Sequence, residues 1–432
     1  MVRRQLLSSV TIGLLGLGAK VAFTLPWLGQ QQHISADETA RLPAPSYALN
    51  EMPLIKDSAI GFSEVQESCK LPFTSRQLNE GFGSDPTTFM VPSTGILQAY
   101  MVFVEFDDAP ASEKVTDLFD LYMPAASEWY GNASFGRLNL RVTADLSRFH
   151  RMPRNASAYD YRRGMGYKFH RKYVQDALDA VGESVDFAGT DLLYIVPTRE
   201  AAAISYSPTF MPPIEAHDGT LIKKTVTFGQ DVDEFGFQVM NHETGHTMGL
   251  CDLYSYTPHT QAGVYVGGYD LMAQIGGISP DFLAWHKWRL GWLDDDQIMC
   301  LTPGAKKSVR GKGWRVVLTP IEEGKGLKAL VVKRNATLAL VAENRSGRRL
   351  NSATCGTGVL IYTVSTITES GRGPIRVQDS SPDSGCAGQR LNDALFVPGH
   401  HNRSSFTSPE FGVNIEVLEE IKEGFVLNVS LL

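Results

Sequence analysis

Residues 242–252 read His-Glu-Thr-Gly-His-Thr-Met-Gly-Leu-Cys-Asp. On a helix, His242 and His246 lie one turn apart on one face, so both imidazoles can bind a single ion. Glu243 projects about 100° around the helix axis from His242, which suits a general base better than a ligand. The second glycine of the segment can adopt the left-handed conformation that ends a helix, so the chain can turn back and bring Asp252 to the ion. The segment therefore predicts a metal site with these two histidines and Asp252 as ligands and one open position.

Two imidazoles, one carboxylate and an open position are typical of catalytic zinc, which polarises a carbonyl group and lowers the pKa of a bound water to about 7. Glu243 would take a proton from that water and pass it to the leaving nitrogen of a peptide bond. In a chain of this composition, a chance His-Glu-x-x-His match is expected about once in a hundred chains. A structural zinc site is an alternative because Cys251 precedes Asp252, but such sites close all four positions with protein ligands and would leave Glu243 without a role.

The residues before the motif predict a helix with a defined start. Apolar residues from Phe235 onward recur every three or four positions and fall in line with the two histidines, so they share one helical face. Asp231 and Glu234 stand three residues apart ahead of this run, which predicts a capping box at the helix start.

Strand-like and helix-like segments alternate before residue 297. The run 97–106 is rich in β-branched and aromatic residues, as a central strand would be. Strands that alternate with helices indicate a mixed sheet with helices packed against it. Further strands are expected at 136–142, 191–196 and 221–228, and helices at 115–122 and 167–181.

After residue 297 the pattern changes to strand-like runs separated by Gly, Ser and Asn. No long helical pattern remains, so we expect a β-rich C-terminal unit arranged as a sandwich. The expected fold class is therefore α/β (α+β). The expected strands are 314–318, 327–332, 338–342, 358–364, 413–418 and 425–431.

Residues 242–254, with Leu-Tyr at their end, resemble the immune inhibitor A-type metallopeptidases, a family of the metzincin group. The resemblance covers roughly residues 90–430, and some exported fungal proteins share the pattern. It implies a metzincin-like catalytic domain with a mixed twisted sheet and an active-site helix. The other segments that carry it are Pro92–Gly95, Ser134–Leu138, Gly268–Met272, Trp285–Trp292, Ala342–Arg345 and Gly358–Tyr362.

Carried over residue by residue, the resemblance implies that His242, His246 and Asp252 bind zinc, and that Glu243 is the base. It also implies that Met272 is the methionine of the tight turn beneath the metal. The commoner third ligand of the metzincin group is a histidine, so the aspartate is a departure. Asp270 is the reserve candidate for that position.

Several other side chains carry weaker expectations. Tyr254 or Tyr256 could donate a hydrogen bond to an oxyanion, although core packing is the commoner role for a tyrosine. The three aspartates at 294–296 could bind a structural Ca²⁺, although such a charge run is more often a solvated loop. The tryptophans at 285, 288 and 292 have helical spacing and are expected in the core.

The N-terminus has the pattern of an export signal. Arg3 and Arg4 precede an apolar run, residues 6–19, that is too short to span a bilayer. We expect a signal peptide at 1–22; the arginine pair also fits a twin-arginine signal, so the export route stays open. Residues 23–90 are expected to be a prosegment or an arm packed on the main domain.

Six Asn-x-Ser/Thr sequons favour a eukaryotic secretory route and an extracellular glycoprotein. No later segment reaches the about 18 apolar residues that a membrane span needs. The candidate N-glycosylation sites are Asn132, Asn155, Asn335, Asn344, Asn402 and Asn428.

The chain has five cysteines, and most should be bridged in an oxidising compartment. Cys355 and Cys386 make the favoured disulfide, and a Cys251–Cys300 pair is a weaker expectation. Cys69 would then be left over. Its place in the N-terminal region suggests a latency hypothesis in which its thiolate occupies the open zinc position, although a disulfide is the commoner fate.

The formal net charge of −7 argues against nucleic acid as a partner. The sequence thus predicts a secreted zinc endopeptidase that acts on extracellular proteins or peptides, without a membrane partner and as a monomer. Its catalytic domain would span 91–297 and its β-rich domain 298–432. The alternative is a secreted binding or adhesion protein in which the zinc is structural.

Overall fold

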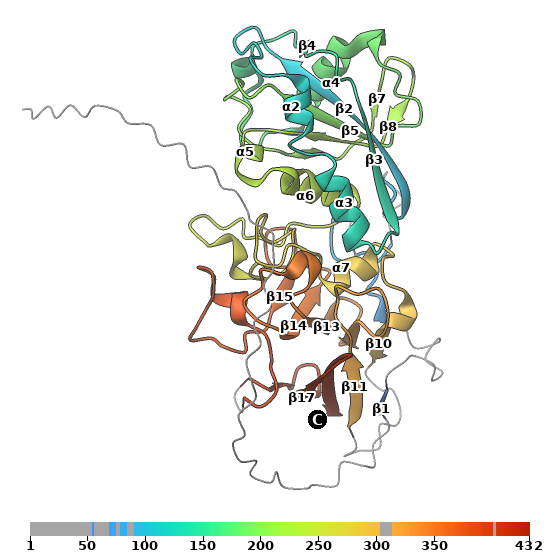
Figure 1. Ribbon diagram of the computed structural model, residues 1–432, viewed down its shortest axis with the longest axis vertical. Coiled ribbons are helices and arrows are strands. Elements are labelled where there is room, and N and C mark those ends of the chain that lie inside the picture. Colours follow the sequence, from blue (N-terminus) through green and yellow to red (C-terminus); the bar gives the residue numbers. More distant parts are fainter. Residues whose placement is uncertain (1–53, 56–68, 75–77, 84–89, 303–312, 401–402) are drawn as a thin grey trace, which may run out of the picture. The chain divides into compact units, whose positions relative to one another are not determined.

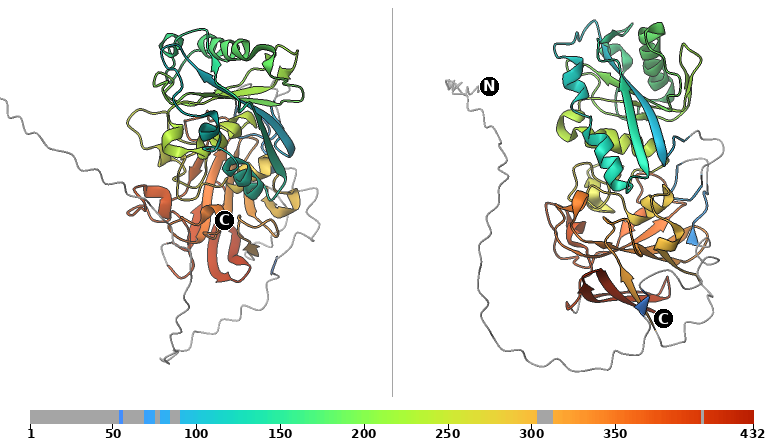
Figure 2. Two further views of the ribbon diagram at one scale, coloured as in Figure 1. Left: turned by 45° about the horizontal axis from the view of Figure 1, so that its top comes forward. Right: turned by 45° about the vertical axis from the view of Figure 1, so that its right-hand side comes forward.

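A mixed sheet forms the first half of the fold, with the apolar run near residue 100 as a central strand (Figure 1). The computed structural model describes residues 54–55, 69–74, 78–83, 90–302, 313–400 and 403–432. Most pairs in the sheet are parallel, and the edge strand β6 is antiparallel to its neighbour. The strand order is β3 (Leu138–Ala144), β2 (Gly95–Glu105), β5 (Leu192–Pro197), β9 (Lys224–Thr227) and β6 (Thr209–Phe210), with β4 (His150–Arg151) paired to β2. Figure 2 shows β2 and β3 as long strands lying side by side.

Helices cover both faces of this sheet because its strands are apolar on both sides. Along β2, Leu97 and Phe103 join one buried cluster, and Val102 joins another on the opposite face. The second cluster contains the apolar residues of α4 (Tyr167–Val181), whose bounds match the predicted helix. The first cluster contains those of α3 (Ala125–Ala133) and α6 (Phe237–Thr247). The remaining elements of this half include α2 (Val115–Phe119), α5 (Val232–Phe235), α7 (Ala284–Arg289), β7 (Ile214–Glu215) and β8 (Leu221–Ile222).

The helix that was expected to run unbroken from Asp231 is divided. Gly236 has a φ of 56° and separates α5 from α6, a conformation that glycine adopts without strain. The capping box is absent, because the carboxylate of Asp231 instead accepts hydrogen bonds from the backbone N–H and the hydroxyl of Ser207, at 2.9 Å and 2.6 Å. The end of the helix is as predicted: Gly249 has a φ of 97° just after α6.

The predicted strand at 221–228 is also divided, into β8 and β9. β8 pairs with β7, whereas β9 pairs with β5 and β6. Between them, Lys223 forms an ion pair with Asp191 at 2.7 Å, and its backbone N–H donates to the carbonyl of the same aspartate. The chain changes sheets at this anchored residue.

Two five-stranded sheets share a hydrophobic cluster, and all their strands except one short N-terminal strand come from residues after 297. All six strands that the sequence pattern predicts here are present. One sheet has the order β1 (Leu54–Ile55), β11 (Trp314–Leu318), β18 (Gly424–Leu431), β17 (Val413–Ile421) and β16 (Ser405–Ser408). The other has the order β10 (Ile298–Leu301), β12 (Ala329–Lys333), β13 (Leu338–Arg345), β14 (Gly358–Ser365) and β15 (Ile375–Val377).

In the second sheet, the strands β10, β12, β13 and β14 bury apolar residues on both faces. On β13, Leu340 and Ala342 face the cluster between the two sheets, while Ala339 and Val341 belong to the cluster that contains α3 and α6. The hydrophobic core is therefore continuous across residue 297. The fold is mixed α/β with several sheets and few helices, as the α+β expectation requires.

Two disulfides cross-link the chain. Cys355–Cys386 is confirmed. The expectation for the other cysteines is wrong: Cys69 pairs with Cys300, and Cys251 is a buried free thiol. Sequence distance hid this pair, because 231 residues separate its members. The latency hypothesis loses its thiolate, since the Cys69 sulfur is already bonded.

The segments 69–74 and 78–83 pack into the core. Leu71 and Glu80 are fully buried, and Phe82 packs edge-on against Trp285 with ring centroids 5.0 Å apart. The indole N–H of Trp285 donates to the Glu80 carbonyl at 3.0 Å. These contacts pack both segments against the main domain. The part of the predicted prosegment outside the two segments lies almost wholly outside the described residues, as does the predicted signal peptide.

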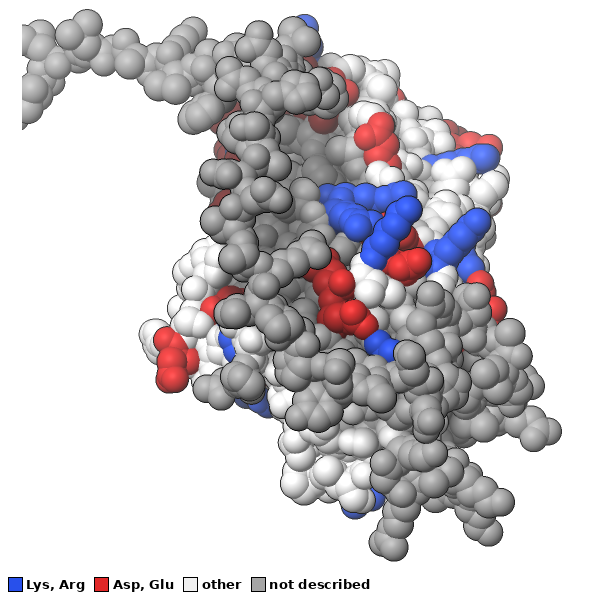
Figure 3. Space-filling view, turned by 60° about the horizontal axis from the view of Figure 1, so that its bottom comes forward, with Lys and Arg blue, Asp and Glu red and all other residues white. Residues whose placement is uncertain are grey.

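No helix in the described part of the chain is long and apolar enough to cross a membrane, and the two disulfides fit an extracellular protein. On the face shown in Figure 3, basic and acidic side chains lie next to one another in the described part of the surface.

Candidate metal centre

His242 and His246 are held in fixed orientations by the backbone around them. The Nδ1 atom of His242 lies 3.0 Å from the carbonyl oxygen of Leu271, and that of His246 lies 2.9 Å from the carbonyl oxygen of Leu250. Each Nδ1–H therefore donates to a carbonyl, which leaves both Nε2 lone pairs free to bind a ligand. Such outer hydrogen bonds are how proteins fix the tautomer of metal-binding histidines.

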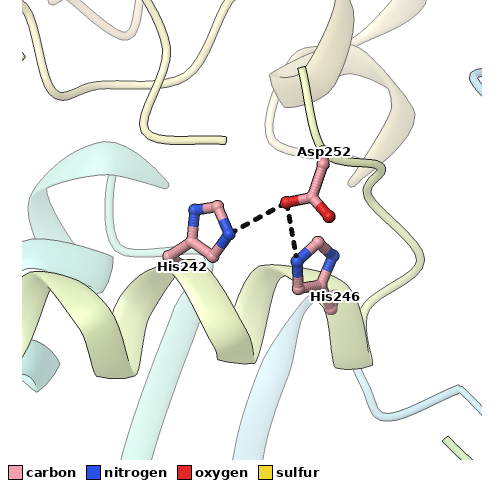
Figure 4. A group of neighbouring side chains, drawn as sticks. All are labelled: His242, His246 and Asp252. Carbon is pink, nitrogen blue, oxygen red and sulfur yellow. Dashed lines mark hydrogen bonds and ion pairs between the residues drawn. The ribbon is translucent and has the colours of Figure 1, made fainter. Parts of the chain in front are cut away.

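Both Nε2 atoms converge on one carboxylate oxygen. Oδ1 of Asp252 lies 3.1 Å from Nε2 of His242 and 3.2 Å from Nε2 of His246. Figure 4 shows the two rings rising from α6 and the carboxylate approaching from the chain that follows it. The structure thus brings together the three predicted ligands.

Four contacts hold Asp252 in place. Its backbone N–H lies 3.0 Å from the hydroxyl of Ser370, and its carbonyl accepts from the N–H of Gly371 at 3.0 Å. Its second carboxylate oxygen accepts a hydrogen bond from the hydroxyl of Tyr256. The next residue, Leu253, donates from its N–H to the carbonyl of Met272 at 2.9 Å. The third ligand is therefore positioned partly by a loop of the β-rich half.

The residues fit a divalent cation. One ligand atom from each of His242, His246 and Asp252 lies within 4.8 Å of the others, so one ion could contact all three. Burial opposes the charge on Asp252, but the neighbouring imidazoles hold its pKa well below its usual range. Burial would lower the pKa of His246, but the Asp252 carboxylate raises it to about 10. The Asp252 carboxylate thus favours positive charge at the point where the two Nε2 atoms converge, and a bound cation would supply that charge.

Glu243 lies beside the triad without joining it. Burial raises the pKa of its carboxyl group, against the opposing effect of the two histidines. The hydroxyl of Thr209, on the edge strand β6, donates to Oε2 of Glu243 at 2.7 Å. A raised pKa moves a carboxylate towards the range that suits a general base near neutral pH. Thr209 was missed by the sequence analysis, because 34 residues separate it from Glu243 and no motif marks it.

Met272 lies directly beneath the helix that carries the histidines. A Cβ atom on Gly245 would stand 2.7 Å from the sulfur of Met272, so a larger residue at 245 would require the thioether to shift. The Met272 side chain is fully buried.

Asp270, the reserve ligand, does not face the triad. It accepts hydrogen bonds from the N–H groups of Met272 and Leu283, at 2.7 Å and 2.8 Å, and pairs with His286 at 2.8 Å. Its position below the centre makes it a support of the methionine turn.

An open cleft with a volume of about 280 Å³ borders the triad at His246 and Asp252, whereas His242 is buried and lies outside its lining. Its lining includes Glu243, His246 and Asp252, and it also includes Tyr254 and Tyr256. Tyr256 is occupied by its hydrogen bond to Asp252. Tyr254 lies over the site, with its ring centroid 6.1 Å from that of His242.

The other candidates lie elsewhere. Asp294 pairs with Arg137, and Asp295 with Lys70, so these carboxylates already have cationic partners. The three tryptophans are buried, as expected. Among the sequons, Asn132, Asn155 and Asn335 are exposed. Asn428 is half-buried in β18. Asn402 lies outside the described residues.

Asn344 cannot carry a glycan in this fold. It is 1% exposed, and its side-chain N–H donates to the carbonyl of Leu318 at 2.8 Å. A glycan needs an exposed acceptor.

No family model matches the chain, and no curated protein matches it. One solved structure with some likeness is that of wild-type OgpA from Akkermansia muciniphila, with a TM-score of 0.25 and 10% sequence identity over 68% of this chain and 95% of the other. A likeness at this level carries no argument about the fold or the site.

Proposed function

We propose that the chain is a secreted zinc-dependent endopeptidase of the immune inhibitor A type. The observation that carries the proposal is the convergence of both histidine Nε2 atoms on Oδ1 of Asp252, with Glu243 beside them in an open cleft. A site closed by four protein ligands would suit a structural ion, whereas here three side chains converge and two of them, His246 and Asp252, line the cleft.

His242, His246 and Asp252 would hold the ion, and zinc suits two imidazoles and one carboxylate. When bound, zinc supplies Lewis-acid chemistry that polarises a peptide carbonyl and acidifies a water molecule. Glu243 would accept the proton of the attacking water and deliver it to the leaving nitrogen. The hydrogen bond from the Thr209 hydroxyl to Oε2 would fix the orientation of the Glu243 carboxylate. Tyr254 lines the cleft and would donate a hydrogen bond to the developing oxyanion.

The test is the variant Glu243→Gln, measured for zinc content and for cleavage of casein. We expect one zinc per chain to be retained, and cleavage to fall by about a hundredfold to ten-thousandfold. Glu234→Gln is the matched control, because Glu234 is exposed on α5, outside the cleft. Unchanged turnover in Glu243→Gln would exclude this carboxylate as the base. A wild-type protein that binds zinc and cleaves no protein would instead support a structural metal.

A further inference from the structure

The cleft continues beyond the metal centre. The space beside the triad and a second hollow of about 790 Å³ share Arg163, Tyr206, Thr209 and Tyr254 in their linings. A peptide bound across the triad would therefore pass along the turn that carries Arg163.

Arg163 is the permanent cation of this lining. The other charged groups beside the triad, Glu243, His246 and Asp252, belong to the metal centre. The second hollow contains one other basic side chain, that of His170, and burial lowers the pKa of this imidazole to about 4. His170 is therefore neutral at pH 7. Beyond the centre itself, the lining carries no carboxylate in the described part of the chain.

Arg163 is exposed. Its guanidinium forms no ion pair and no hydrogen bond with any other described residue. It lies over the ring of Tyr206, 5.5 Å from the centroid. The hydroxyl of Tyr206 donates to the carbonyl of Arg162, and the N–H of Met165 donates to the same carbonyl at 2.9 Å. These bonds fix the backbone of the turn on both sides of Arg163.

The neighbouring arginine behaves differently. Arg162 pairs with Asp160 at 3.1 Å and does not line the cleft. The two arginines are adjacent and both exposed. Arg162 has an anionic partner and lies outside the cleft, whereas Arg163 lines the cleft and has no such partner.

We propose that Arg163 makes this cleft selective for peptides that carry a carboxylate close to the cleaved bond, which rests on the proposed peptidase function. A guanidinium presents a planar fork of donors that matches both oxygens of a carboxylate. The Tyr206 face beneath it restricts the fork and removes part of its water shell. The carboxylate can come from an acidic side chain or from the end of a peptide chain.

The test uses a matched set of internally quenched peptides with zinc-loaded protein. Each position on either side of the cleaved bond carries Glu, Gln or Lys in turn, with an amidated C-terminus. A second arm has neutral side chains and a free C-terminal carboxylate placed at the same distances. The variants are Arg163→Gln, Arg163→Glu and the matched control Arg162→Gln.

We expect kcat/KM for Glu to exceed that for Gln by about tenfold at one position. This ratio should approach one in Arg163→Gln, reverse in favour of Lys in Arg163→Glu, and stay unchanged in Arg162→Gln. A preference confined to the second arm identifies the chain end as the source of the carboxylate. The proposal is overturned if the wild-type ratio stays below about twofold at every position in both arms, or if it survives in Arg163→Gln.

Binding separates this inference from the peptidase proposal. The Glu and Gln peptides are also titrated into the Glu243→Gln protein, with and without Arg163→Gln, by fluorescence anisotropy. If the wild type cleaves nothing, but tighter binding of the Glu peptide is lost with Arg163, then the peptidase proposal fails and the selectivity stands. If peptides are cleaved and neither cleavage nor binding distinguishes Glu from Gln, then the selectivity fails and the peptidase proposal stands. Loss of both cleavage and acidic binding overturns both.

Discussion

Thr209 donates a hydrogen bond to the carboxylate of the proposed base. Its hydroxyl stabilises the charged form of Glu243, which lowers a carboxyl pKa that burial raises. In Thr209→Val we therefore expect the Glu243 pKa to rise, and the acidic limb of the pH dependence of kcat/KM to move to higher pH. The measurement is a pH–rate profile with zinc saturating. A limb that moves to lower pH, or does not move, would contradict this assignment.

Ser370 and Tyr256 act on the orientation of the third ligand. Removal of an outer hydrogen-bond partner typically costs about tenfold to a hundredfold in metal affinity. We expect this range for zinc dissociation from Ser370→Ala, measured by competition with a chelating dye. Thr368→Ala is the control: it lies in the same loop, and its hydroxyl contacts Ser365 at 2.9 Å. Equal affinities in the two variants would show that the loop does not support Asp252.

The sequence contains the ligands but not their supports, for a physical reason. His242, His246 and Asp252 lie within eleven consecutive positions, where helix period and one glycine turn determine proximity. Thr209 and Ser370 reach the same place only through the folding of an edge strand and a distant loop. Single serines and threonines also carry no periodic pattern, so no local signal marks them.

At the scale of elements, helix α6 and the turn at Met272 fit each other through Gly245. An alanine at 245 would gain about 1 kcal/mol in helix propensity, but overpacking against a buried sulfur typically costs about 1–3 kcal/mol. We therefore expect Gly245→Ala to lower Tm and weaken zinc binding.

Two comparisons test this balance by thermal unfolding. Gly131→Ala, in α3, should raise stability slightly, because a Cβ atom there meets nothing within 4 Å. The double variant Gly245→Ala/Met272→Ala should lose less stability than the sum of the losses in the two single variants. The alanine at 245 would then occupy space that the Met272 side chain has left. Strict additivity would show that the two residues do not contact each other.

The bounds of helices and strands could be predicted from the sequence where a local hydrophobic pattern alone determined them. The 3.6-residue period of α4 and the apolar strands after 297 are local, and their positions were predicted closely. Gly236 and Lys223 divide elements that the periodicity joined. At Gly236 the division follows from a positive φ, and at Lys223 a tertiary ion pair with Asp191 anchors the chain where it changes sheets.

At the scale of the whole molecule, a buried charge network ties the N-terminal arm to the floor of the metal centre. Glu80 pairs with His286 at 2.9 Å, and His286 pairs with Asp270, which holds the N–H of Met272. Burial would lower the pKa of His286, but the two carboxylates raise it to about 10. Burial would raise the pKa of Glu80, but His286 lowers it to about 2.

The contribution of this network to stability should fall at both high and low pH. His286 titrates near 6.5 when unfolded, so its contribution is complete below about pH 6.5 and is lost as pH rises through about 10. The Glu80 contribution is complete above about pH 4.5 and is lost as pH falls towards 2.

In His286→Gln, the loss of Tm relative to wild type should therefore be largest near pH 6 and shrink towards pH 10. Unfolding is followed with a chelator present, so that metal binding does not contribute. His217→Gln, at an exposed position, should show no such trend. A loss for His286→Gln that is constant over this range would rule out the charged network.

The strands from β10 to β15 lie between two hydrophobic clusters, and this affects how the chain can be divided. Both the half that carries the candidate metal centre and the outer β-sheet bury their apolar surfaces on this sheet, and four of its strands, β10, β12, β13 and β14, contribute to both clusters. A gene fragment that stops at residue 297 would leave one of these surfaces in water, and so would a fragment that begins there. Neither half is thus a transferable module, and efforts to graft the metal centre onto another scaffold, or to shorten the protein for expression, should keep this sheet in the same polypeptide.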